Sequence, residues 1–184
     1  MAVARVVPTL GSMYARVLTL LDSRADRRDA LVLGAQLTDE DGALLVADVL
    51  QTAPVALDGS ARDAARQRAR LRDYRGEVYA TLGPDPRVRY LPVSGLLLAE
   101  AAVVLARREQ AQVIVIGQDL FSRSGDPHEL VANAPCPVAV APYGHRFARG
   151  SALARIALAA DDDDVSALLR DARTPILLTA PVRR

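Results

Sequence analysis

Two positions combine residue types that can contact a ligand with the end of an apolar run. Asp22 follows one such run, and Gly117 ends another. A short polar segment soon after Gly117 contains Ser122, Arg123, Ser124 and Gly125. Hydroxyl groups, a guanidinium and a glycine in a loop are suitable hydrogen-bond donors to a phosphate group. Together these residues form the candidate nucleotide or anion site of the chain.

Each half of this candidate site also has a plainer interpretation. A short segment rich in serine and glycine is a common surface connector. Asp22 precedes Ser23, and Ser23 with Asp26 has the spacing of a helix-capping pair, so Asp22 could simply neighbour a helix start. The residues alone leave both interpretations open.

The remaining reactive side chains favour neither catalysis nor metal binding. The histidines, His128 and His145, have no serine or cysteine at a spacing typical of a catalytic triad. The single cysteine, Cys136, lies between two prolines and is typical of a small packed side chain. The acidic run 161–164 lacks the glycine spacing of a calcium loop, and a helix start explains it better. We therefore predict no metal site and no enzyme.

The charge of the chain excludes several classes of partner. Its 184 residues include 23 Lys and Arg against 22 Asp and Glu, so no overall field attracts nucleic acid or an anionic membrane. All the basic residues are arginine, which removes the amine that a phosphate-loop lysine or Schiff-base catalysis needs. The arginine-rich stretch 62–75 is interleaved with acidic residues and is predicted to be a solvated helix face.

Composition favours a cytoplasmic globular protein. The chain is 51% hydrophobic and 24% charged, which is typical of one ordinary domain with a small appendage. A single cysteine permits no disulfide within the chain and fits a reducing compartment. No apolar stretch approaches the roughly 20 residues of a membrane-spanning helix. The first residues, interrupted by Arg5, Pro8 and Gly11, are not expected to be a secretory signal.

The elements that would position the candidate site alternate between apolar runs and amphipathic patterns, which indicates a parallel sheet wrapped by helices. Strands are predicted at 17–21, 43–50, 87–93, 113–117 and 137–142. Helices are predicted at 23–41, 60–82, 97–108, 127–134 and 165–172. Gly42 is expected to close the first helix and Gly83 the second. The prolines around the fifth strand are typical of a sheet edge.

The C-terminal part of the chain repeats two earlier pieces. The segment 150–161 aligns without a gap on 11–22, and 173–181 resembles 135–142. We interpret 145–184 as a second copy of the domain whose middle is missing. Such a fragment is too small to bury a core alone, so it is expected to dock on the first domain or on another chain.

Between Arg16 and Pro142 the order of motifs resembles the universal stress protein family. The most specific motifs are QVIVIG, which ends at Gly117, and NAPCPVAVAP around the last strand. The resemblance implies an α/β fold of the adenine nucleotide alpha hydrolase type. This is a doubly wound, five-stranded parallel sheet of order 3-2-1-4-5 with helices on both faces, here with a C-terminal β-α-β extension. Its crevice opens where the winding reverses, at the strand ends marked by Asp22 and Gly117.

The resemblance also implies a phosphate loop after the fourth strand, and this chain departs from it. Nucleotide-binding members have the pattern Gly, two residues, Gly, nine residues, Gly, and then Ser or Thr. Gly117 matches the first position, but the others fall on Leu120, Leu130 and Val131. Side chains at these positions keep a backbone away from a polyphosphate. We therefore expect ATP binding to be impaired or absent, and no cofactor.

These observations predict a non-catalytic stress-response or regulatory protein that acts through self-association or protein binding. Its domains are expected at 1–15, an N-terminal arm, at 16–144 and at 145–184. The resemblance implies a homodimer through edge strands, and the extra strands near 3–7 and 176–179 could extend that edge. Neither nucleic acid nor a membrane is an expected partner.

The alternative is an adenine-nucleotide switch. In that hypothesis Ser122, Arg123 and Ser124 replace the glycine loop after the fourth strand, and Asp22 holds the nucleoside end of ATP. The two hypotheses differ in whether ATP binds at all.

Overall fold

The sheet and most of its covering helices are placed by the structure, a computed structural model that describes residues 7–9, 14–21, 27–50, 61–94, 98–123, 127–147, 153–157, 172 and 174–179. The strands are β1 (Val7–Thr9), β2 (Tyr14–Leu21), β3 (Thr38–Leu50), β4 (Val88–Ser94), β5 (Val113–Gly117), β6 (Val138–Ala141), β7 (Leu153–Ala157) and β8 (Ile176–Thr179). The helices are α1 (Arg27–Leu37), α2 (Ala61–Leu82), α3 (Leu98–Arg108), α4 (Gln118–Arg123), α5 (Pro127–Asn133) and the 3-10 helix η1 (His145–Phe147).

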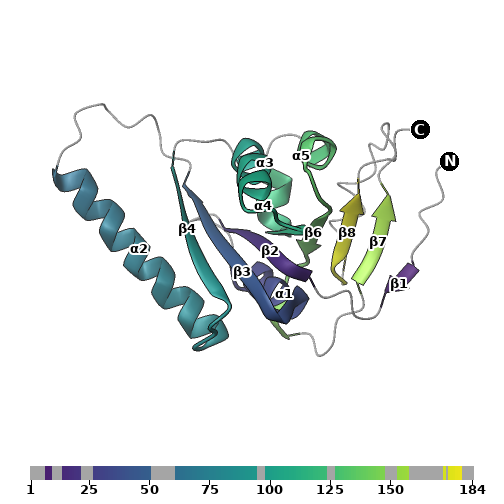
Figure 1. The fold of residues 1–184 in the computed structure, drawn as a ribbon, viewed down its shortest axis with the longest axis horizontal. Helices are drawn as coiled ribbons and strands as arrows, with labels where there is room; N and C mark the ends of the chain where they lie inside the picture. Colours follow the sequence, from purple (N-terminus) through teal and green to yellow (C-terminus); the bar gives the residue numbers. More distant parts are fainter. Residues whose placement is uncertain are drawn as a thin grey trace.

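The described strands form one 8-stranded sheet in the order β1-β7-β8-β6-β5-β2-β3-β4 (Figure 1). Its centre is parallel: β2 lies between β3 and β5, β4 lies outside β3, and β6 lies outside β5. Numbered along the chain, these central strands have the order 3-2-1-4-5, so the predicted doubly wound α/β fold is confirmed. The winding reverses between β2 and β5, where such a sheet opens its crevice.

Apolar side chains bury both faces of the sheet under helices. On one face, Leu18 and Ile116 belong to a core with residues of α3, α4 and α5. On the other face, Val17 and Val115 pack with residues of α1 and α2. Strand side chains point alternately to the two faces, so neighbours such as Val17 and Leu18 enter different cores. Figure 1 shows α3 and α5 on one side of the sheet and α1 on the other.

Helix α1 lies close against β2 because a glycine faces the sheet. A Cβ atom at Gly34 would collide with Thr19 Oγ1, so no other residue fits there without a shift of the Thr19 side chain or of the helix. The other residues predicted to share this helix face, Ala30, Leu33 and Leu37, are all buried. The amphipathic pattern therefore predicted the buried face of α1 correctly.

The first helix ends earlier than predicted, and Gly42 has a different role. Helix α1 ends at Leu37 and β3 begins at Thr38, so Gly42 lies inside a strand. A Cβ at Gly42 would lie 3.0 Å from the carbonyl oxygen of Ala15, in the stretch where the pairing of β2 with β3 shifts register. Gly42 therefore permits a close approach of two backbones rather than a helix end. Gly83, with φ of 72°, ends α2 as predicted.

Three strands extend the sheet beyond β6. Strand β8 pairs with β6 antiparallel, β7 with β8 parallel, and β1 with β7 antiparallel. The prediction that the fifth strand is an edge is therefore wrong, because β6 lies between β5 and β8. Pro137 and Pro142 lie just outside β6, so they remove no N–H group from its ladder. The predicted helix at 165–172, except Ala172, lies outside the described residues.

Candidate functional site

Only part of the predicted nucleotide site falls within the described residues. Gly117 is the last residue of β5 and is buried at the carboxyl end of the sheet. Its neighbour across the crevice, β2, ends at Leu21. Ser122 and Arg123 belong to α4, and their side chains are not described. Three candidate residues lie wholly outside the described part of the chain: Asp22, Ser124 and Gly125.

The segment after β5 is a helix where the sequence predicted a polar loop. Helix α4 begins at Gln118, directly after Gly117, and ends at Arg123. Leu120 and Phe121 on this helix are buried in the core beside α3 and α5. This apolar pair holds the segment against the sheet. The prediction of a loop is therefore wrong at Ser122 and Arg123, which belong to the helix.

The three positions at which this chain lacks the expected glycine, or the expected Ser or Thr, lie in the same apolar core. Leu120, on α4, and Leu130 and Val131, on α5, are 5%, 0% and 3% exposed. All three belong to the same apolar core, so the two short helices pack on the sheet through them. Cutting such a side chain back toward glycine removes buried apolar contacts, and each truncation of this kind costs about 2–5 kcal/mol. The departure from the phosphate-loop pattern is therefore part of the packing of this fold.

A small hollow remains where β5 and β6 end. It has a volume of about 10 Å³, which is room for about one water molecule. Its lining residues are Asp29, Gly117, Gln118, Asp119, Ala141 and Tyr143. Two of these residues carry carboxylates, and a carboxylate repels a phosphate group. As far as the described residues form it, this hollow suits neither the size nor the charge of a nucleotide.

A third carboxylate lies further along the same edge of the sheet. Asp48, near the end of β3, is in register with Leu21, the residue before Asp22. Its side chain is buried at 8% exposure. In the sequence, Asp48 is the single charge inside the apolar run 43–50. This isolated charge was the feature from which the residue could have been identified.

The turn after β6 is held by one buried aspartate. Asp29, near the start of α1, accepts hydrogen bonds from the N–H groups of Gly144 at 2.9 Å and Arg146 at 2.8 Å. Gly144 has φ of 78°, a conformation that glycine adopts without strain. The Asp29 carboxylate thus accepts hydrogen bonds from two backbone N–H groups that could otherwise bind an anionic ligand. No sequence spacing predicted this contact, because its partners are more than a hundred residues apart.

His145 completes the same buried cluster. Its side chain is 2% exposed, and its Nε2 lies 2.9 Å from Gln36 Oε1 on α1. Since an amide oxygen only accepts, Nε2 donates this bond. Burial lowers the pKa of His145, and the nearby Asp29 opposes that shift. The histidine therefore fastens η1 to α1 in its neutral form.

One hydrogen bond links the turns after β5 and β6. The side-chain oxygen of Gln118, the first residue of α4, accepts from the Tyr143 N–H at 3.1 Å. Gln118 and Tyr143 both line the hollow. The contact closes the space between the ends of the two strands.

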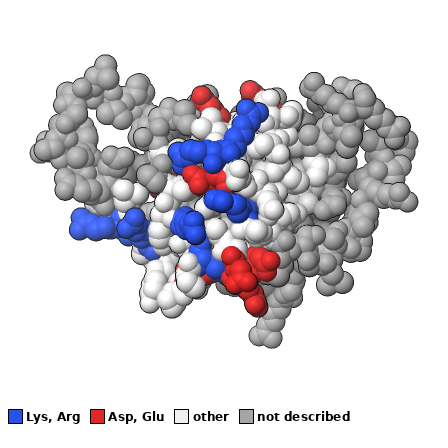
Figure 2. All heavy atoms as spheres, in the orientation of Figure 1, with Lys and Arg blue, Asp and Glu red and all other residues white. Residues whose placement is uncertain are grey.

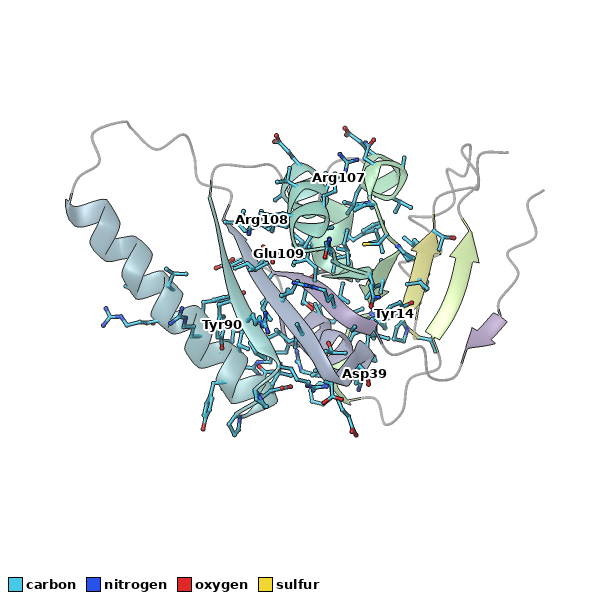
Figure 3. The ribbon with its side chains drawn as sticks, in the orientation of Figure 1. Tyr14, Asp39, Tyr90, Arg107, Arg108 and Glu109 are labelled. Carbon is cyan, nitrogen blue, oxygen red and sulfur yellow. The ribbon has the colours of Figure 1, made fainter. Side chains whose placement is uncertain are left out.

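At the opposite edge of the sheet, described arginines form ion pairs with acidic neighbours. Arg87 Nη2 lies 2.7 Å from Asp85 Oδ2, and Arg87 Nη1 donates to the carbonyl oxygen of Thr38 at 2.9 Å. The hydrogen bond from Arg87 lowers the pKa of Asp85. At the end of α3, Arg108 pairs with Glu109 at 2.8 Å (Figure 3). Arg87 thus fastens the turn before β4 to the start of β3.

The surface view agrees with that assignment. Figure 2 shows arginine side chains next to acidic ones on this face. On α2, the Arg75 guanidinium lies 5.1 Å from the centre of the Tyr90 ring on β4, a cation–π contact between helix and strand. Tyr90 is labelled beside α2 in Figure 3. Arg75 thus contacts the protein itself.

The other reactive groups give no further site. Burial raises the pKa of the Cys136 thiol to about 11, so the thiolate that acts as a nucleophile is scarce at neutral pH. The described residues contain no cluster of three His, Cys, Asp or Glu side chains placed to hold a metal ion. The acidic run 161–164 and His128 lie outside the described side chains. None of the described helices is long and apolar enough to cross a bilayer.

Comparison with known proteins identifies the fold. No family model matches the sequence, and no curated protein matches it. Among solved structures, a universal stress protein from Lactobacillus plantarum shares 19% identity with a TM-score of 0.51, covering 71% of this chain and 99% of its own. A universal stress protein from Archaeoglobus fulgidus shares 17% identity with a TM-score of 0.48, covering 70% and 99%.

A further similar structure is described as a universal stress protein in complex with cAMP. It shares 18% identity with a TM-score of 0.49, covering 68% of this chain and 97% of its own. The Lactobacillus plantarum structure, with a TM-score of 0.51, establishes the fold. The chain has the α/β fold of universal stress proteins.

Proposed function

We propose that this chain is a cytoplasmic, universal-stress-protein-like regulatory module that acts without catalysis, through self-association or by binding another protein. Its ATP binding is impaired or absent, and it uses no cofactor. The fold supports the family-like role, and the buried side chains of Leu120, Leu130 and Val131 support the loss of nucleotide binding. The cytoplasmic location rests on the single cysteine.

The main support for the proposal is the burial of the three residues that replace the glycine pattern. Leu120, Leu130 and Val131 take the positions of the missing glycines and the missing Ser or Thr, and all three are buried in one core. A backbone that wraps a polyphosphate needs bare α-carbons facing the ligand. In this chain the same positions carry side chains that hold α4 and α5 on the sheet.

The charges at the strand ends support the same proposal. Asp29, Asp48 and Asp119 lie along the carboxyl edge of the sheet. Asp29 already accepts the two backbone N–H groups of the turn after β6. A phosphate group placed here would meet carboxylates where nucleotide sites offer donors.

A thermal-shift titration with ATP, ADP and cyclic nucleotides tests the proposal. A site with a Kd of about 10 µM would add about 2.7 kcal/mol at 1 mM ligand, or roughly 5–10 °C in Tm for a chain of this size. We expect no shift above the scatter. A saturable shift would contradict the proposal.

The nucleotide switch is the second candidate, supported by the retained Gly117 at the buried end of β5 and by Arg123 at the end of α4. In that case Asp22→Ala and Arg123→Ala would each remove the thermal shift. Arg72→Ala, on the exposed part of α2, is the matched control and would leave the shift unchanged.

The self-association route is also a proposal. A homodimer through edge strands was expected from the resemblance, and in the described sheet the outer strands are β1 and β4. Strand β6 is not open, since β8 pairs with it.

A further inference from the structure

The pairing of β6 with β8 has a reciprocal register. Val138 pairs with Leu178, Ala139 with Leu177, and Val140 with Ile176. The two strands run antiparallel, and Figure 1 shows them side by side in the middle of the extended sheet. Each residue of β6 in this ladder thus has one partner on β8.

The sequence repeat turns this register into a symmetry. Aligning Pro175 on Pro137 places Ile176 on Val138, Leu177 on Ala139 and Leu178 on Val140. Ala139 therefore pairs with its own equivalent, Leu177. The outer pairs are also exchanged reciprocally, because Val138 meets the equivalent of Val140 and Val140 meets the equivalent of Val138. This is the pairing that a two-fold axis between identical strands produces.

The packing around the two strands follows the same relation. Val138 and Val140 lie in one core with Ile176 and Leu178. Ala139 and Leu177 lie in the other core. The local two-fold relation therefore preserves the two faces of the sheet.

The segments that precede β6 and β8, and the strands that flank them, can be compared in the same way. Ala134 and Ala172, which the same alignment makes equivalent, are both packed against one core. On the outer sides, β5 is parallel to β6 and β7 is parallel to β8, so the flanking strands keep the same direction, although the repeat aligns β7 with β2 and not with β5. The two-fold relation between equivalent residues thus concerns β6 and β8.

We infer that β8 takes, within one chain, the place on β6 that a second copy of this chain would take. An uncovered β6 would present a row of unpaired backbone groups, and two such strands could meet about the same axis, with Ala139 opposite Ala139. The side chains of β6 are no larger than those of β8, so the exchange needs no extra space. The tail therefore closes β6 against self-association. This inference goes beyond the proposed function and does not depend on the loss of ATP binding.

Cysteine cross-linking in the full chain tests the inference, in a Cys136→Ser background that removes the native thiol. Residues in register across antiparallel strands are close enough for a disulfide. With Ala139→Cys and Leu177→Cys together, we expect oxidation to give a disulfide within one chain and the mass of a single 19.7 kDa chain. A disulfide-linked dimer from this pair would overturn the inference, since β8 would then be exchanged between chains.

Two further variants test whether a second copy fits on β6. Ala139→Cys alone is expected to give no linked dimer, and a dimer as the main product would show an open β6 and overturn the inference. Adding Leu177→Pro removes an N–H from β8 opposite Ala139, and we expect the linked dimer to become the main product. Thr179→Pro is the matched control, because Thr179 pairs with β7 and has no partner on β6.

A second variant is designed to detach β8 from β6 without introducing a proline. Leu178→Asp places a charge in the core beneath β8 and should detach the strand while β6 stays intact. If Ala139→Cys with Leu178→Asp keeps the helix content of the parent by circular dichroism and still gives no linked dimer, the place on β6 does not fit a second copy and the inference is wrong. A linked dimer in either release variant supports it.

Discussion

The turns that follow β5 and β6 leave the sheet side by side and are stabilised by different means. After β5 the chain enters α4, which is held by buried apolar side chains. After β6 it enters η1, which is held by polar groups of α1, the buried Asp29 and the exposed Gln36. The two phenylalanines of the chain show the contrast, since Phe121 is fully buried and Phe147 is 76% exposed.

The difference shows two ways in which the chain is held in place where a strand ends. After β5, buried apolar side chains of α4 pack against the sheet. After β6, two backbone donors remain, and the carboxylate of Asp29 accepts both. The first turn is held by apolar packing and the second by hydrogen bonds to a buried carboxylate, so mutations should affect them with different magnitudes and different pH responses.

The largest effect is expected from Phe121→Ala, because Phe121 is fully buried in the turn after β5. Truncating a buried phenylalanine costs about 3–5 kcal/mol in the free energy of unfolding. The matched control is Phe147→Ala in the turn after β6, where the exposed ring contacts the Arg146 guanidinium at 4.6 Å and its loss should cost about 1 kcal/mol or less. Denaturant unfolding of both variants measures the difference. Equal losses would remove the contrast between the turns.

The next effect is expected from Asp29→Ala. The change leaves the N–H groups of Gly144 and Arg146 without their acceptor, at a cost of about 2–3 kcal/mol. Asp73→Ala on the exposed face of α2 is the control and should change stability by less than about 0.5 kcal/mol. Chemical denaturation at pH 7 compares the two. An Asp29 variant as stable as the control would show that the carboxylate does not hold the turn.

A smaller effect is expected from Gln118→Ala, which removes the contact between the two turns. Tyr143 is exposed, so water replaces the lost partner and the cost should be about 0.5–1 kcal/mol. Hydrogen exchange gives a sharper result: the Tyr143 amide should exchange faster, while the Gly144 amide stays protected by Asp29. Faster exchange at both amides would mean that the turns open as one unit.

The smallest effect concerns pH, since burial and Asp29 shift His145 in opposite directions. The pKa of His145 is lowered in the folded state, so between that value and the ordinary value of 6.5 the unfolded chain binds more protons. His145 therefore contributes stability that is fully present above pH 6.5 and falls as the pH drops through the folded pKa.

Unfolding free energies at pH 8 and pH 5 test this contribution. We expect the loss of stability on acidification to be larger in the wild type than in His145→Asn. An identical pH dependence in both proteins would show that protonation of His145 is not coupled to unfolding.

Much of the fold was predictable, because local patterns decide it. The apolar run at 113–117 predicted a strand buried on both faces, and the helical spacing of Ala30, Leu33 and Leu37 predicted the buried face of α1. The strand order came from the family resemblance, since periodicity contains no information about neighbours. The role of Gly42 was missed because a close approach of two strands depends on the partner strand as well as on the glycine.

The site was less predictable for a physical reason. Leu120, Leu130 and Val131 could be recognised as departures from a glycine pattern, but their common burial required the placement of α4 and α5. The hydrogen bonds of Asp29 to Gly144 join distant parts of the chain, and no local spacing encodes them. The position of β6 inside the sheet was missed because prolines flank both edge strands and interior strands that end there, although the sequence did indicate that the strand near 176–179 could extend that edge.

We propose that the crevice between β2 and β5 does not bind ATP, and isothermal titration calorimetry of the full chain with ATP and magnesium measures this binding. We expect no saturable heat up to about 1 mM ATP, which corresponds to a binding free energy weaker than about −4 kcal/mol. Saturable binding at micromolar ATP that disappears in Asp22→Ala would contradict it.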